Sequence, residues 1–93
     1  METTSDIHLG QVVRSKAGRD KGKVFTVLNI VDDEYVLIVD GDYRRLDNPK
    51  KKKIKHLIVY KTIIEELKER LTNGQKVNNA FIRKALDPFN KEI

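Results

Sequence analysis

The chain has 93 residues, 35% of them charged, with 19 Lys and Arg against 14 Asp and Glu, a formal net charge of +5 and no cysteine. This length favours one domain, and the lack of cysteine excludes disulfide and thiolate chemistry. No stretch approaches the roughly 20 apolar residues of a membrane span, and the polar N-terminus lacks the order of a secretory signal. We therefore expect a cytoplasmic protein without a membrane partner. Its basic balance favours an acidic partner, above all nucleic acid.

The first sixty residues are typical of β-strands. Four apolar runs rich in β-branched residues are "LGQVV" (9–13), "KVFTVLNIV" (23–31), "YVLIVDG" (35–41) and "HLIVY" (56–60). Turn residues separate them, including "DG" at 40–41, which favours a two-residue hairpin. Both faces of residues 24–31 are largely apolar, so we expect a strongly bent strand in a small barrel that buries parts of both faces. The pattern predicts a mainly β fold, a small barrel of short strands.

Two helices are predicted after the strands. Ile63, Ile64, Leu67 and Leu71 recur at helical spacing, behind Thr62 as an N-cap. "NG" at 73–74 ends this helix, and a second helix begins near 78 or 79 and ends before the proline at 88. Helices this short are not stable alone, so we expect them to pack on the barrel. The predicted organisation is a barrel over residues 7–60 and a helical extension over 61–93.

The segment "SKAGRDKGKV" (15–24) is a candidate phosphate-binding loop. Its candidate residues are Lys16, Gly18, Arg19, Lys21, Gly22 and Lys23. A nucleotide-binding P-loop needs four residues between its glycines and a hydroxyl residue after the lysine. Here the glycines have three residues between them, and Val24 follows the lysine. A nucleotide site is therefore excluded, which leaves a loop for nucleic-acid phosphates or a flexible solvated turn.

This part of the chain resembles a known family. "GQVVRSKAGRDKGKVFTVLNI" (10–30) resembles the KOW motif of ribosomal and transcription-elongation proteins; the matching positions are Gly10, Val12, Gly18, Lys21, Gly22 and Val24. With "LIVDG", the Arg pair at 44–45 and "IKHL", residues 9–60 resemble the archaeal and eukaryotic large-subunit ribosomal protein fourteen family and stand-alone bacterial KOW-domain proteins. The resemblance implies an SH3-like (KOW) barrel of about five strands that binds RNA. It does not cover the helical extension.

A second basic segment, "YRRLDNPKKKKIKH" (43–56), carries seven cations and one anion. Its candidate RNA-binding residues are Tyr43, Arg44, Arg45, Lys50, Lys51, Lys52, Lys53, Lys55 and His56. Four consecutive lysines repel one another and need an anionic partner or full solvation. We predict a second basic loop that binds phosphates, with a solvated loop as the alternative. Tyr43 could stack on a base, or could pack on the barrel.

The predicted function is binding. His8 and His56 are the only histidines, too few for a zinc site, and no catalytic arrangement stands out, so we expect neither an enzyme nor a cofactor. We predict a ribosomal or ribosome-associated protein, monomeric when free, that contacts ribosomal RNA phosphates and has ribosomal proteins as candidate further partners. Two alternatives stay open. One is a KOW module of the transcription-elongation type that docks on polymerase or another protein, and the other is a DNA-binding helix pair.

Overall fold

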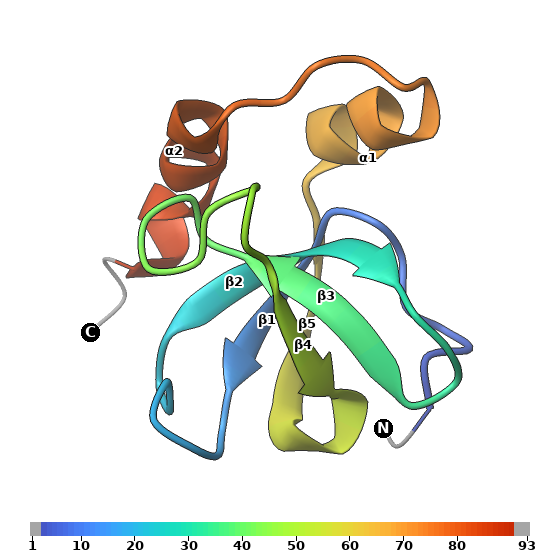
Figure 1. Ribbon diagram of the computed structural model, residues 1–93, viewed down its shortest axis with the longest axis vertical. Coiled ribbons are helices and arrows are strands. Elements are labelled where there is room, and N and C mark those ends of the chain that lie inside the picture. Colours follow the sequence, from blue (N-terminus) through green and yellow to red (C-terminus); the bar gives the residue numbers. More distant parts are fainter. Residues whose placement is uncertain (1–2, 91–93) are drawn as a thin grey trace.

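The computed structural model describes residues 3–90 and shows a mainly β domain with two C-terminal helices (Figure 1). One antiparallel sheet has the strand order β4-β3-β2-β1-β5. The elements are β1 (Gln11–Ser15), β2 (Val24–Ile30), β3 (Tyr35–Val39), β4 (Lys50–Lys53), a 3₁₀ helix η1 (Ile54–His56), β5 (Leu57–Ile63), α1 (Glu65–Thr72) and α2 (Asn79–Asn90). The sheet curls into a small barrel-like domain, so the predicted fold class is confirmed.

The core has two parts, one on each face of β2. Phe25 and Val27 are fully buried on the inner face of the barrel, with Val13, Val36, Ile38 and Ile54. Val24 is buried on the outer face, under the helices. Successive side chains of a strand point to opposite faces, and here both faces are covered. Parts of both faces of β2 are therefore buried, as predicted, because the helices cover its outer face at Val24; the burial does not extend over the whole strand, since Asn29 is exposed.

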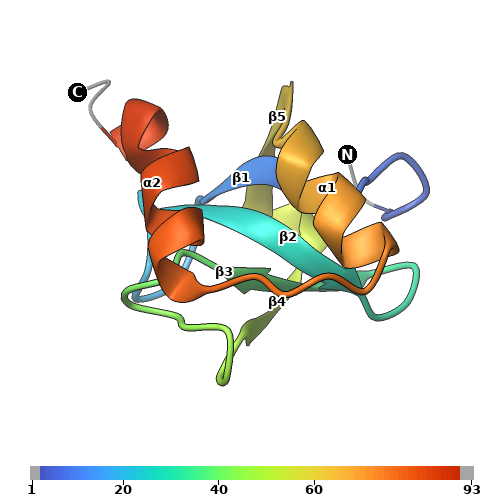
Figure 2. The same cartoon turned by 90° about the horizontal axis from the view of Figure 1, so that it is seen from above.

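Both helices pack on the same side of the sheet (Figures 1 and 2). Leu67 of α1 and Ile82 and Leu86 of α2 are fully buried. They form one cluster with Val12, Val24 and Val39. The helices thus cover the apolar outer face of the sheet, which the sheet alone would leave exposed to solvent. No helix within residues 3–90 is long and apolar enough to cross a membrane.

The start of α1 differs from the prediction. Thr62 lies in β5 and not at an N-cap, because β5 continues along β1 as far as the pair Gln11↔Ile63. The Ile64 N–H then donates to the Gly10 carbonyl at 2.8 Å, and α1 begins at Glu65 without a side-chain cap. The predicted end at "NG" is confirmed, since α1 stops at Thr72.

The end of α2 also differs. The helix begins at Asn79 as predicted but passes through Pro88 and ends at Asn90. Proline has no backbone N–H, so the bond to the Lys84 carbonyl is missing, but only two residues of α2 follow Pro88. The Phe89 ring lies 5.9 Å from the Tyr60 ring, and this contact with β5 holds the last turn against the sheet.

The predicted two-residue hairpin at "DG" is wrong. Residues 40–49 form a longer β3–β4 loop. The Asp40 carboxylate accepts hydrogen bonds from the N–H groups of Asp42 and Arg44, at 3.0 and 2.7 Å. These bonds close a local turn inside the loop, as Asp side chains commonly do. The chain therefore leaves the sheet here and returns to it at β4.

Candidate nucleic-acid interface

The β1–β2 loop (residues 16–23) is the centre of the candidate interface. Backbone hydrogen bonds close its base: the Ser15 N–H donates to the Lys23 carbonyl at 3.0 Å, and the Gly22 N–H to the Ser15 carbonyl at 2.8 Å. Gly18 and Gly22 have positive φ angles of 86° and 89°. The loop's cationic side chains are all exposed: Lys16, Arg19, Lys21 and Lys23. Among residues 3–90, none of these four is in a salt bridge.

The one carboxylate of this loop, Asp20, is fully buried. Its Oδ1 accepts hydrogen bonds from Lys52 Nζ at 2.9 Å and from Ser15 Oγ at 2.7 Å. Its Oδ2 lies 3.0 Å from Lys50 Nζ, and Lys52 Nζ also donates to the Ala17 carbonyl at 2.8 Å. Two lysines of β4 therefore neutralise Asp20 and tie the loop to the sheet.

The pKa of Asp20 reflects this arrangement. Burial on its own raises the pKa of a carboxyl, because it disfavours the charged form. The bonds from Ser15, Lys52 and Lys50 outweigh burial and hold the pKa of Asp20 well below its ordinary value of 3.8. Asp20 is thus an anion at neutral pH, and its negative charge is neutralised by the two lysines of β4.

The predicted lysine-rich loop is, as a structure, wrong: the four lysines form strand β4, paired with β3. The alternation of a strand sends them to two places. Lys50 and Lys52 face Asp20, and Lys52 is only 7% exposed. Lys51 and Lys53 place their ammonium groups 4.8 and 5.9 Å from the Tyr35 ring centroid, and Lys53 lies 3.8 Å from Glu34. Two of the four predicted phosphate ligands are therefore paired with Asp20, Lys52 in the interior and Lys50 in a partly exposed position.

Two other segments adjoin the β1–β2 loop. The Lys16 N–H donates to the carbonyl of His56, in η1, at 3.0 Å. On the other side, Lys23 Nζ lies 4.9 Å from the ring centroid of Tyr43, in the β3–β4 loop, and the Arg44 guanidinium lies 5.7 Å from it. Arg45 and Lys55 are exposed in the same two segments. The structure thus groups most of the predicted residues around one loop.

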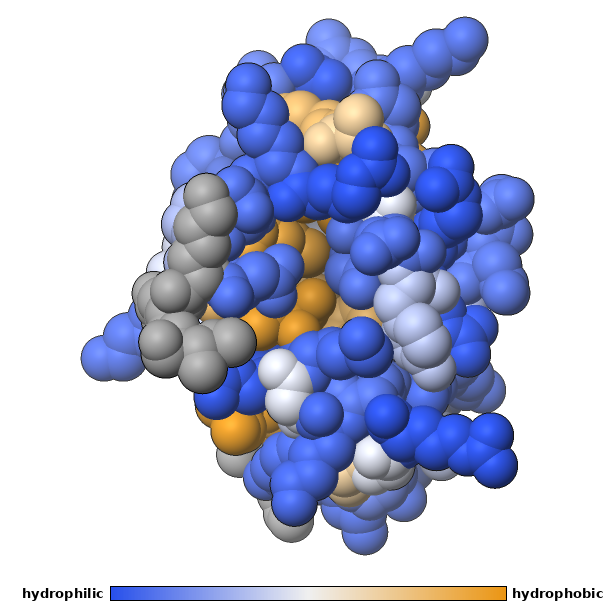
Figure 3. Space-filling view, turned by 90° about the vertical axis from the view of Figure 1, so that its left-hand side faces the viewer, coloured by the Kyte–Doolittle hydropathy of each residue, from blue (hydrophilic) through white to orange (hydrophobic). Residues whose placement is uncertain are grey.

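Figure 3 views the side of the molecule on which the β1–β2 and β3–β4 loops lie. Most of this side is hydrophilic, with an apolar strip in its middle. We call the following residues the basic surface: Lys16, Arg19, Lys21, Lys23, Tyr43, Arg44, Arg45, Lys55 and His56. Gly18 and Gly22 shape its central loop.

Three residues that hold this surface in place were not among the predicted site residues. Asp20 is one, and its signal was available: it is the single anion among the cations of its loop. Asn79 and Arg83 of α2 are the others. Asn79 Oδ1 accepts the Leu46 N–H at 2.8 Å, and Arg83 Nη1 donates to the Gly41 carbonyl at 2.7 Å. No short sequence motif marks contacts between segments so far apart in the chain.

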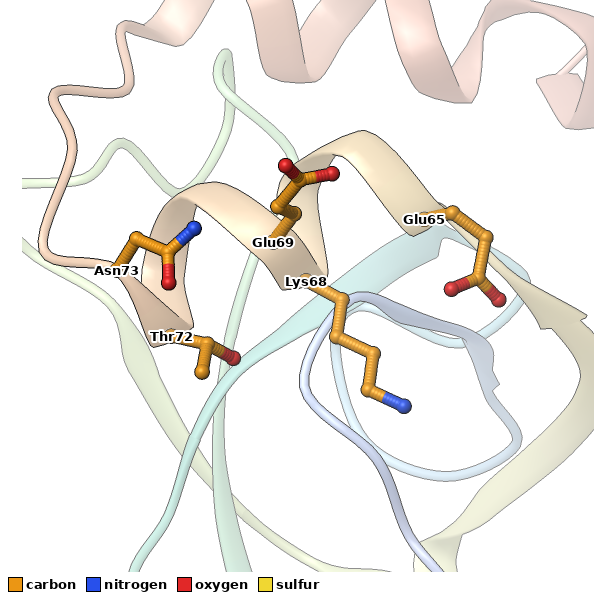
Figure 4. Close-up of a pocket in the computed structure, with 5 residues that line it drawn as sticks. All are labelled: Glu65, Lys68, Glu69, Thr72 and Asn73. Carbon is orange, nitrogen blue, oxygen red and sulfur yellow. The ribbon is translucent and has the colours of Figure 1, made fainter.

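A surface hollow of about 240 Å³ lies elsewhere, on α1 (Figure 4). It is lined by Glu65, Lys68, Glu69, Thr72 and Asn73. Their polar ends point in different directions instead of converging on one point. Within residues 3–90, no three His, Asp or Glu side chains are grouped so as to hold a metal ion.

The fold and the basic surface define a small β domain with a docked helical pair and one strongly cationic loop. The chain is 30% identical over 73 residues to a protein of Bacillus subtilis (strain 168) with the name "Putative ribosome-binding protein YbzG". The match covers 78% of this chain and 99% of that protein. The chain therefore belongs to the same family as the Bacillus subtilis protein. No family model matches it.

Proposed function

We propose that this chain is a cytoplasmic, ribosome-associated protein whose basic surface binds phosphates of ribosomal RNA. The observation that carries the proposal is the charge that the β1–β2 loop exposes to solvent. Its one carboxylate is buried and neutralised from inside, so that everything charged that the loop presents to solvent is cationic. The name of the Bacillus subtilis relative, a ribosome-binding protein, supports the ribosome as the source of the RNA.

The mechanism is electrostatic. Exposed ammonium and guanidinium groups neutralise backbone phosphates and release the counterions condensed on the RNA. Such contacts fix where the protein lies without reading the sequence. The tie between Asp20 and β4 keeps the loop in one shape, which lowers the entropy lost on binding. We propose a binding protein without catalytic activity, monomeric when free, and a KOW-type barrel as its RNA-binding scaffold.

Removing loop cations is expected to weaken binding in a salt-dependent way. Replacing Arg19 and Lys21 together with Ala should reduce the slope of log affinity against log salt by about one to two, since each lost phosphate contact contributes about 0.7 to 0.9. Both side chains are exposed, so the free energy of unfolding should change by less than about 0.5 kcal/mol. Filter binding of ribosomal RNA fragments over a salt series measures the slope.

The matched control is the pair Lys51→Ala and Lys53→Ala. It removes the same number of positive charges from the Tyr35 side of β4, away from the loop. A decrease in slope equal to that of the loop variant would show that net charge alone drives binding and that the loop is not the site. A salt-independent affinity of the parent protein would contradict phosphate binding altogether.

Ribosome association is tested separately, by sedimentation of a lysate through a sucrose gradient. Co-migration with the large ribosomal subunit is expected, together with its loss in the Arg19 and Lys21 double variant. Co-migration with RNA polymerase instead would contradict the proposal and favour the protein-docking alternative.

A further inference from the structure

Tyr43 is an exposed aromatic residue in a polar loop. Its exposed fraction is 48%, and it joins neither of the two hydrophobic clusters. Tyr60, in contrast, packs on Phe89 and belongs to the cluster under the helices. The neighbours of the Tyr43 ring are instead two cations from different segments, Lys23 at 4.9 Å and Arg44 at 5.7 Å. The ring therefore contributes little to the core.

The loop that carries Tyr43 is held firmly in place. The Asp40 and Gly41 N–H groups both donate to the Arg44 carbonyl, at 2.9 and 3.0 Å, so the turn closes around Tyr43. Gly41 has a positive φ of 81°, and a Cβ there would meet the backbone of α2 at Asn79 and Arg83. The loop and the first turn of α2 are thus in close contact, which only glycine permits.

We infer that Tyr43 is a stacking platform for an unpaired base of the bound RNA, with Lys23 and Arg44 on the phosphates beside that base. The inference rests on the proposed function and deepens it by naming the class of RNA. An aromatic ring stacks on any base whose face is free. Bases inside a regular duplex have no free face, so the target is RNA with an unpaired loop, bulge or end.

The arrangement of charge supports this assignment. Lys23 Nζ and the Arg44 guanidinium lie over the exposed ring. Both cations attract phosphates to the ring, and their flexible side chains can turn from the ring to those phosphates when a base stacks in their place. Because α2 and Asp40 fix the loop beforehand, the ring needs little reordering when a base arrives. This also gives the helical extension a role: α2 holds the platform against the barrel.

The test compares two RNA hairpins with the same stem. One has a loop of unpaired adenosines, and the other has abasic nucleotides in that loop, which keep the phosphates and remove the bases. The parent protein is expected to bind the adenosine hairpin about 5- to 100-fold more tightly than the abasic one. Tyr43→Leu should abolish this difference, and Tyr43→Phe should preserve it, because leucine is apolar but cannot stack.

The outcomes separate the inference from the proposed function. Equal affinity of the parent for both hairpins, with a steep salt dependence, would overturn the stacking inference and leave phosphate binding intact. Failure of the parent to bind either hairpin would overturn the proposed function as well. Thermal unfolding of both Tyr43 variants is expected to match the parent, and a preference that persists in a folded Tyr43→Leu would also overturn the inference.

Discussion

Replacing Asp20 with Asn should lower the free energy of unfolding by about 3–5 kcal/mol, the usual result of removing one partner of a buried ion pair. The substitution keeps the size of the side chain but leaves Lys52, which is 7% exposed, without its counter-charge. Lys50, whose side chain is 24% exposed, can turn towards solvent more readily. Small domains have a total stability of about 5–15 kcal/mol, so this loss is a large part of it.

The pH dependence gives a second check on Asp20. Its pKa is lowered in the folded state, so its contribution to stability is complete above the unfolded pKa and is lost as the pH falls through the folded value. The difference between parent and Asp20→Asn in urea unfolding should therefore be full at neutral pH and shrink below about pH 4. Asp47→Asn, at an exposed carboxylate, is the control and should change stability by less than about 0.5 kcal/mol. Equal stability of Asp20→Asn and parent at neutral pH would contradict the tie to β4.

Four of the five strands, β1, β2, β3 and β5, could be predicted because their signals are local, whereas β4 was predicted as a loop. Runs of β-branched residues and the turn residues between them depend on neighbours in the chain. The wrong predictions lie where contacts between segments distant in the chain determine the local structure. Thr62 remains in β5 because β1 offers it a partner strand, and the residues after Asp40 form a long loop because α2 contacts them. Neither contact leaves a mark in the nearby sequence.

The candidate site shows the same division. The exposed cations of the β1–β2 loop follow directly from composition, and the structure groups them. The four lysines looked equivalent in the sequence, yet strand pairing separates them by alternation. Lys52 meets Asp20 across 32 positions of the chain, and only the folded barrel brings the two charges together. A charge run therefore predicts basic character but not which of its members face solvent.

The second large effect is expected at Leu67, which joins α1 to the sheet. Leu67 is fully buried among Val12, Val24, Val39, Ile82 and Leu86, where α1, α2 and the barrel meet. Leu67→Asp removes this apolar contact and places a carboxyl in the same space. Truncating a buried leucine alone costs about 2–5 kcal/mol, and the polar group adds to that cost. We expect a loss of about 4 kcal/mol or more, measured by urea unfolding.

The matched control is Val31→Asp, which introduces the same group at an aliphatic residue that is 44% exposed, and should cost far less. The introduced carboxyl at position 67 can fold into the core only when protonated, because burial disfavours its charged form. The destabilisation by Leu67→Asp should therefore increase as the pH rises above about 4. Equal stabilities of the two variants would show that α1 does not contribute to the core.

Leu67→Asp should also affect RNA binding, because α2 shares this cluster and holds the Tyr43 loop. We expect a smaller preference for RNA with unpaired bases. The packing of the helices is in this way connected to the basic surface.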